Sequence, residues 1–81
     1  MRLDKYLKVS RIIKRRTVAN EAADAGRVTI NGKTAKPSSV VAVGDILEIR
    51  FGSNQMKVRV RSVKEHAAKD EASGMYEALT D

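Results

Sequence analysis

Three consecutive cations, Lys14-Arg15-Arg16, stand directly before a segment that has the marks of a helix start. The hydroxyl of Thr17 can cap the first amides of such a helix, which we expect to run from about 18 to 25. A helix N-terminus favours anions through its free amides and its dipole, and arginine can bind phosphate through two parallel hydrogen bonds. The cluster therefore predicts a phosphate-binding site; a solvated basic loop is the alternative.

Catalytic or metal chemistry has little support in this sequence. His66 is the only histidine and there is no cysteine, so neither a catalytic triad nor a thiolate metal site can be assembled. Asp70 and Glu71 are adjacent, and their side chains would diverge on a helix. The glycines do not form a phosphate-binding G-x-G-x-x-G or Walker pattern. We therefore expect a binding module that is no enzyme and that has no cofactor, no metal site and no small-molecule substrate.

The positive charge is concentrated at the front of the chain. The net charge is +6, and residues 1–36 hold ten Lys/Arg against three Asp/Glu, which gives +7. Residues 65–81 hold one against five, which gives −4. A basic domain of this size is typical of a partner for a polyanion. No stretch approaches the roughly 18 apolar residues of a membrane span, and the start lacks a signal-peptide core, so we expect a cytoplasmic monomer without a membrane partner.

Two short helices are predicted before any strand. In the segment 2–9, the apolar residues Leu3, Tyr6 and Leu7 follow the i, i+3, i+4 spacing of one helix face. The second helix, after Thr17, is rich in alanine and is expected to end at a left-handed Gly26.

Short strands follow the two helices. Asn31-Gly32 between 28–30 and 33–35 is a strong hairpin signal. Strands are then expected over 46–51 and 56–61, with a turn between them. Tyr6 and Phe51 both fall on apolar stripes and are expected in the core, so base-stacking platforms for single-stranded RNA are not expected.

The C-terminal segment allows two interpretations. Its apolar residues, Ala68, Ala72, Met75, Tyr76 and Leu79, fit one face of an amphipathic helix that docks on the core. Gly74 weakens such a helix, and a frayed acidic tail is the alternative. We therefore divide the chain into a basic domain, 1–62, and an acidic extension, 63–81, that is helical or frayed.

The motifs "RLDKYL", "AGRVTING" and "VGDILEI" together resemble the S-four (αL) RNA-binding domain, from Arg2 to about Val60. The family usually has serine where this chain has Thr17, which preserves the hydroxyl. The resemblance implies an α+β fold in which two N-terminal helices pack on a small bent antiparallel β-sheet, with a short C-terminal helix as an optional addition. RNA would lie against the helical pair and the hairpin that follows.

The resemblance also implies which residues contact RNA, and Asp4 would orient Arg2 or its neighbours by a salt bridge. With Lys14 added from the basic cluster, the predicted RNA-binding set is Arg2, Lys8, Arg11, Lys14, Arg15, Arg16, Arg27, Asn31 and Lys33.

The stretches "LDKYLKVSRIIKRRT" and "MYEAL" are most similar to short stand-alone members that act in bacterial ribosome-associated quality control. This likeness implies binding to rRNA of the large ribosomal subunit and to P-site peptidyl-tRNA on stalled, split subunits. It also implies cooperation with RqcH in C-terminal poly-alanine tailing. The alternatives are a heat-shock-type recycling factor that does not support tailing, and a basic protein-interaction module. The sequence leaves open which rRNA helix is contacted, and whether Lys57, Arg59 and Arg61 form a second RNA face.

Overall fold

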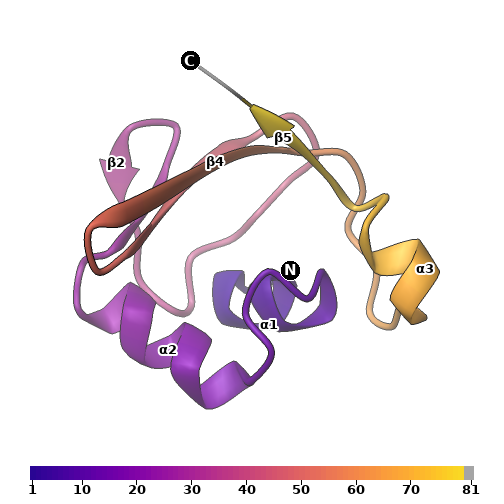
Figure 1. Ribbon diagram of the computed structural model, residues 1–81, viewed down its shortest axis with the longest axis horizontal. Helices are drawn as coiled ribbons and strands as arrows, with labels where there is room; N and C mark the ends of the chain where they lie inside the picture. Colours follow the sequence, from indigo (N-terminus) through magenta and orange to yellow (C-terminus); the bar gives the residue numbers. More distant parts are fainter. Residues whose placement is uncertain (80–81) are drawn as a thin grey trace.

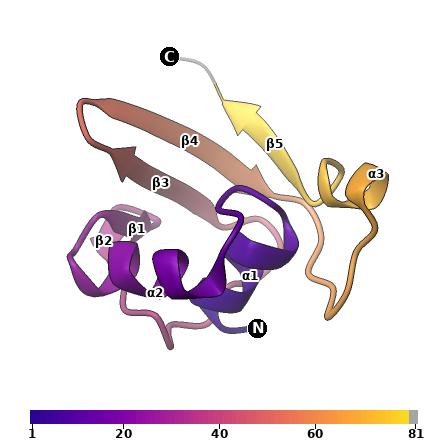
Figure 2. The same cartoon turned by 60° about the horizontal axis from the view of Figure 1, so that its bottom comes forward.

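The computed structural model describes residues 1–79, so Thr80 and Asp81, the end of the predicted acidic extension, lie outside the described residues. It contains a five-stranded antiparallel sheet with strand order β2-β1-β3-β4-β5, and α1 and α2 lie together on one side of that sheet (Figures 1 and 2). The helices are α1 (Leu3–Val9), α2 (Arg16–Asp24) and α3 (Lys69–Ala72). The strands are β1 (Val28–Ile30), β2 (Lys33–Thr34), β3 (Ile46–Phe51), β4 (Asn54–Val60) and β5 (Tyr76–Leu79). The α+β fold expected from the sequence is confirmed.

One apolar core lies between the helices and the sheet. Leu3, Tyr6 and Leu7 of α1 are fully buried, as the i, i+3, i+4 spacing predicts. They belong to the same cluster as Leu47 and Val58, which alternate with outward-facing residues on β3 and β4. No helix within residues 1–79 has the length and apolar character needed to cross a membrane.

The first two amides of α1 donate to backbone carbonyl groups of a loop. The N–H groups of Leu3 and Asp4 donate to the carbonyl oxygens of Ser39 and Pro37, at 2.8 and 3.2 Å. The loop between β2 and β3 therefore occupies the first two amides of α1, and the third, that of Lys5, donates to the Asp4 carboxylate.

The start of α2 differs from the prediction. The helix begins at Arg16, its N-cap residue is Arg15, and that residue makes no capping hydrogen bond through its side chain. Thr17 therefore lies inside the first turn and is not the cap. The physical reason is that Arg16 and Asn20, four positions apart, share a helix face and both contact Asp4. The end of the helix is as expected, because Gly26 has a left-handed φ of 76°.

The two predicted hairpins are both present. Asn31 and Gly32 have φ values of 51° and 85°, and a positive φ at both central positions is the mark of a type I′ turn. The prediction for Phe51 is wrong, because its side chain is 39% exposed. It pairs with Asn54 at the end of the β3–β4 hairpin, which projects away from the two helices (Figure 2).

The C-terminal segment forms a short helix followed by a strand. Only Lys69–Ala72 is helical, whereas Tyr76 and Leu79, which the spacing placed on the same helix, lie on β5 and pair with Val60 and Lys57. The fifth strand supplies hydrogen-bond partners to the edge of β4, and a pattern of apolar spacing alone does not reveal that requirement.

Candidate nucleic-acid interface

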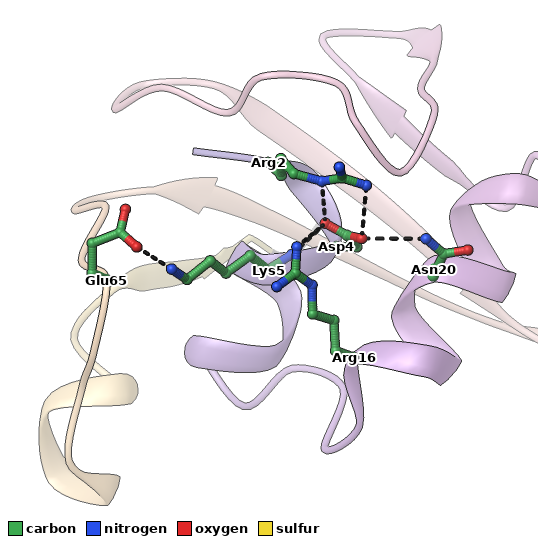
Figure 3. A network of polar contacts seen from close by, with 6 residues as sticks. All are labelled: Arg2, Asp4, Lys5, Arg16, Asn20 and Glu65. Carbon is green, nitrogen blue, oxygen red and sulfur yellow. Dashed lines mark hydrogen bonds and ion pairs between the residues drawn. The ribbon is translucent and has the colours of Figure 1, made fainter.

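A buried carboxylate organises the polar face of the helical pair. Asp4 is only 2% exposed, and its two carboxylate oxygens accept hydrogen bonds from Nε and Nη2 of Arg2 at 3.1 and 3.2 Å. Asn20 donates to the same carboxylate at 3.2 Å, and Arg16 pairs with it at 3.5 Å (Figure 3). The backbone N–H of Lys5 donates at 2.8 Å. The carboxylate thus holds the arginine at the start of each helix, Arg2 for α1 and Arg16 for α2. The salt bridge predicted between Asp4 and Arg2 is present.

The charge of Asp4 is maintained despite its burial. Burial alone raises the pKa of this carboxyl, but hydrogen bonds from Arg2 and Asn20, the nearby charge of Arg16 and the Lys5 amide outweigh it. The pKa of Asp4 therefore lies below its ordinary value. At neutral pH the site contains a fixed anion whose partners, Arg2 and Arg16, remain about half exposed.

Next to this network lies a groove of about 770 Å³. The cations that line it are Lys5, Lys8, Arg11, Lys14, Arg16 and Lys69. Four of them belong to the predicted RNA-binding set. Within residues 1–79, no carboxylate lies at ion-pair distance from Lys8, Arg11 or Lys14. The groove therefore presents three cations that no carboxylate of residues 1–79 matches.

The connection between α1 and α2 positions two of the groove's cations, Arg11 and Lys14. Ile13 is buried and its N–H donates to Leu7 at 3.0 Å, so the chain turns back tightly after α1. Arg11 takes a left-handed φ of 63°, a conformation that costs a non-glycine residue about 1 kcal/mol. A cation is thus present where glycine would be favoured on backbone grounds alone.

The other predicted residues lie around or away from the groove. Arg15, at the N-cap of α2, is exposed, as are Arg27 and Lys33 near the β1–β2 hairpin. The side chain of Asn31 has a structural role, since its amide oxygen accepts from the Ile46 N–H at 2.9 Å. Its amide nitrogen donates to Asp45 at 3.2 Å. Arg27, Asn31 and Lys33 do not line the groove.

Sequence reasoning missed four residues of the site. Asn20 was four positions beyond Arg16, which is a signal for a shared helix face. Asn20 contacts Asp4 and does not line the groove, whereas Lys5, Glu65 and Lys69 do, and no local pattern connects residue 5 with residues 65–69. Their proximity depends on the path of the C-terminal segment.

The basic residues of β4 are arranged differently. Glu48 lies directly opposite Lys57 on β3, with 3.8 Å between the charged atoms. Glu77 lies opposite Arg59 on β5, at 3.2 Å. The strand register thus places a carboxylate beside each of these two cations.

The described residues show no arrangement of metal-binding side chains. Within residues 1–79, no group of three His, Asp or Glu side chains could hold a metal ion. His66 is exposed at the side of the groove, as expected for a surface histidine.

Comparison with known proteins places this geometry in a family. The S4 domain model matches residues 1–47. The "RQC P-site tRNA stabilizing factor" of Streptococcus pneumoniae is 56% identical over 81 residues, which cover all of this chain and 92% of that protein. Heat shock protein 15 of Escherichia coli is 36% identical; the match covers all of this chain but 62% of that protein.

A solved structure shows the same fold. The trimeric structure of Vibrio cholerae heat shock protein 15 aligns with a TM-score of 0.89 and 30% identity, over 98% of this chain and 81% of that one. The match of the S4 domain model and the identity along the whole chain agree with each other. The chain therefore belongs to the S4 domain family and, within it, to the group of RQC P-site tRNA stabilizing factors.

Proposed function

We propose that this protein is an RNA-binding factor of the large ribosomal subunit, where it binds rRNA and P-site peptidyl-tRNA on stalled, split subunits. In this role it supports RqcH-dependent C-terminal poly-alanine tailing in ribosome-associated quality control. The names of the relatives support the tRNA part of the proposal. The contacts to rRNA and to RqcH rest on the resemblance noted from the sequence.

The observation that carries the proposal is the groove with its unmatched cations. A phosphate backbone supplies regularly spaced anions, and each contact releases counterions from the RNA. Lys8, Arg11 and Lys14 have no carboxylate at ion-pair distance in the part of the chain that the structure describes, while Asp4 orients Arg2 and Arg16 beside them. Such a surface recognises the shape and backbone of RNA rather than base edges.

The N-terminus of α2 adds to this surface. Its N-cap residue, Arg15, makes no capping hydrogen bond through its side chain, in contrast to α1, where loop carbonyls occupy the first amides. We propose that a phosphate binds near this end of α2 with Arg15 and Arg16. Arg27, Asn31 and Lys33 would extend the contact along the hairpin, with Asn31 acting through the turn that it stabilises.

The proposed role requires no catalysis by this chain. The protein would act in the cytoplasm as a monomer that bridges two RNA backbones, with the RNA-binding surface in residues 1–62 and an acidic extension in 63–81. The relative from V. cholerae is described as trimeric, so the oligomeric state needs its own measurement. Light scattering of the purified protein should give the mass of one chain, and a trimer mass would contradict the monomer.

A second function is favoured by the likeness to heat shock protein 15. In that case the protein would recycle stalled large subunits after heat shock without tailing. A basic module for an acidic protein partner is the remaining alternative, and it predicts binding that survives removal of RNA.

The test is capture of the tagged full-length protein from lysate, with and without RNase. We expect large subunits with tRNA and RqcH in the captured material, and we expect RNase to remove them. Large subunits without RqcH would favour the recycling role. Free tRNA alone, or an acidic protein that resists RNase, would contradict the proposal.

Single substitutions test the assignment of the surface. Arg16→Ala and Arg2→Ala should each weaken binding to stalled large subunits and leave the fold intact. Arg59→Ala, a matched control on the strand face, should bind normally because Glu77 already compensates this arginine. Normal binding by both helical-face variants would show that the surface is assigned wrongly.

A further inference from the structure

An acidic side chain from the C-terminal segment reaches into the basic groove. The carboxylate of Glu65 forms an ion pair with the ammonium group of Lys5, although the two residues are sixty positions apart (Figure 3). Among the described residues that line the groove, Glu65 is the only carboxylate. In Figure 3 the Lys5 side chain points away from Asp4 and toward Glu65, so Lys5 is separate from the arginine cluster.

The fold holds the segment that carries Glu65 in place. The Tyr6 hydroxyl of α1 donates to the Met75 carbonyl at 2.8 Å in a buried position. The same carbonyl accepts from the N–H groups of Arg61 and Ser62, at 2.8 and 3.2 Å. Ala67 packs against the core. Glu65 therefore lies on a segment whose two ends are fixed, and its position over the groove is a property of the fold.

The contact itself is weak enough to be exchanged. The Glu65 side chain is 69% exposed, and its pKa is lowered by the hydrogen bond and the charge of Lys5. Exposed ion pairs contribute little to stability, so a stronger anion can replace such a carboxylate at small cost. A phosphate in the groove would in addition interact with Lys8, Arg11 and Lys14.

We propose that Glu65 occupies the place of an RNA phosphate on Lys5, and that a phosphate of the bound RNA displaces it. This inference rests on the proposed function. The carboxylate lowers the affinity of the groove for any polyanion, and an RNA binds well only when its shape also satisfies the remaining cations. Glu65 thus reduces non-specific binding to RNA and contributes to specificity by competition.

The competing explanation is that Glu65 acts only as one more negative charge on the acidic segment. Glu71 allows the two explanations to be separated. It lies on the same segment and pairs with Lys64 at 3.5 Å, but it does not line the groove. Its replacement by glutamine changes the net charge by the same amount.

The experiment measures affinity of the full-length protein for purified large subunits and for a generic RNA duplex. Its variants are Glu65→Gln, Lys5→Gln, the double variant and the control Glu71→Gln. Glu65→Gln should raise affinity for both probes within about 1.5- to fivefold, the range expected for an exposed ion pair, and the gain should be larger for the generic duplex. Lys5→Gln should not raise affinity, and in its background Glu65→Gln should have no further effect. Glu71→Gln should change little.

Three results would overturn the inference. They are an unchanged affinity for Glu65→Gln, an equal gain in the Lys5→Gln background, and an equal gain for Glu71→Gln. The variant Lys8→Gln tests whether the groove binds RNA at all, and so distinguishes an error in this inference from an error in the proposed function. If Lys8→Gln weakens RNA binding while Glu65→Gln has no effect, only the inference is wrong. If the wild-type protein does not bind either probe, both are wrong.

Discussion

Two surfaces of this small protein are rich in lysine and arginine, and they differ in what surrounds the charges. In the groove beside α1 and α2, Lys8, Arg11 and Lys14 have no carboxylate at ion-pair distance within the described residues. On the strand face, Lys57 and Arg59 each lie opposite a glutamate of the neighbouring strand. The sequence shows both surfaces as basic, but among the described residues Lys57 and Arg59 are paired with glutamates while Lys8, Arg11 and Lys14 are not.

This difference shows that the strand register decides whether a basic residue has a carboxylate beside it. In an antiparallel sheet the residue directly opposite lies within reach of an ion pair, so the pairing of β3, β4 and β5 fixes the neighbours of Lys57 and Arg59. The connection after α1 has no facing strand. Its cations therefore lie next to other cations, and an external anion can relieve their repulsion.

Asp4→Asn should affect the helical face more strongly than any single change on the strand face. The substitution keeps the shape but removes the charge that holds Arg2 and Arg16, and we expect the free energy of unfolding to fall by about 2 kcal/mol. Large-subunit affinity should fall about tenfold, because the arginines are no longer oriented. Urea unfolding followed by circular dichroism and a ribosome pelleting assay measure the two effects.

Glu77→Gln is the matched control for this change, since it removes an exposed carboxylate from an arginine pair. Its cost should stay below about 1 kcal/mol. Equal losses of stability for the two variants would show that the Asp4 network is no more important than a surface pair.

The pH dependence of the free energy of unfolding tests whether the ionised Asp4 carboxylate stabilises the protein. The pKa of Asp4 in the folded protein lies below its ordinary value of 3.8. A lowered folded pKa adds stability that is fully present above the unfolded pKa and is lost as pH falls through the folded pKa. The stability difference between wild type and Asp4→Asn should therefore shrink as pH falls below about 3.8. A difference independent of pH would contradict the ionised network.

Tyr6→Phe tests whether the C-terminal segment is held against α1. The substitution removes the hydroxyl that donates to the Met75 carbonyl and leaves the ring in the core. We expect a loss of about 1 kcal/mol in the free energy of unfolding. Hydrogen exchange should accelerate in residues 61–76, which include Glu65 and Lys69 of the groove, and not in the β1–β2 hairpin. Unchanged exchange in 61–76 would show that other contacts hold the segment.

Arg11→Gly and Arg11→Ala separate the cost of the left-handed backbone at residue 11 from the contribution of the arginine charge. Both remove the cation, so both should weaken large-subunit binding by a similar factor. Glycine also relieves the left-handed conformation, so Arg11→Gly should be more stable than Arg11→Ala by about 1 kcal/mol. Thermal unfolding measures the difference, and equal stabilities would remove the case for strain at this position.

Local patterns predicted the elements that are determined locally. The i, i+3, i+4 spacing located α1, the Asn31-Gly32 pair located the first hairpin, and alternation located β3 and β4. Gly26 ended α2 as expected. In each case the structural cause is contained within a few residues of the chain.

The errors arose where distant residues decide the outcome. Thr17 has the chemistry of a cap, but α2 starts two residues earlier than predicted, and Arg16 and Asn20 on its first turns contact Asp4. Tyr76 and Leu79 fit a helix, but the edge of β4 recruits them into a strand. For the same reason Lys5, Glu65 and Lys69 could not be assigned to one groove before the path of the C-terminal segment was known.

The central claim is that unmatched cations, and not basic residues in general, bind the large subunit. Its most direct test compares two double variants that each remove one lysine and one arginine, Lys8→Gln with Arg11→Gln and Lys57→Gln with Arg59→Gln. The measurement is the affinity for purified large subunits as a function of salt concentration. The groove variant should lower the slope of log affinity against log salt by about two, roughly one for each lost phosphate contact, while the strand variant should leave it nearly unchanged. Equal reductions for the two variants would contradict the claim.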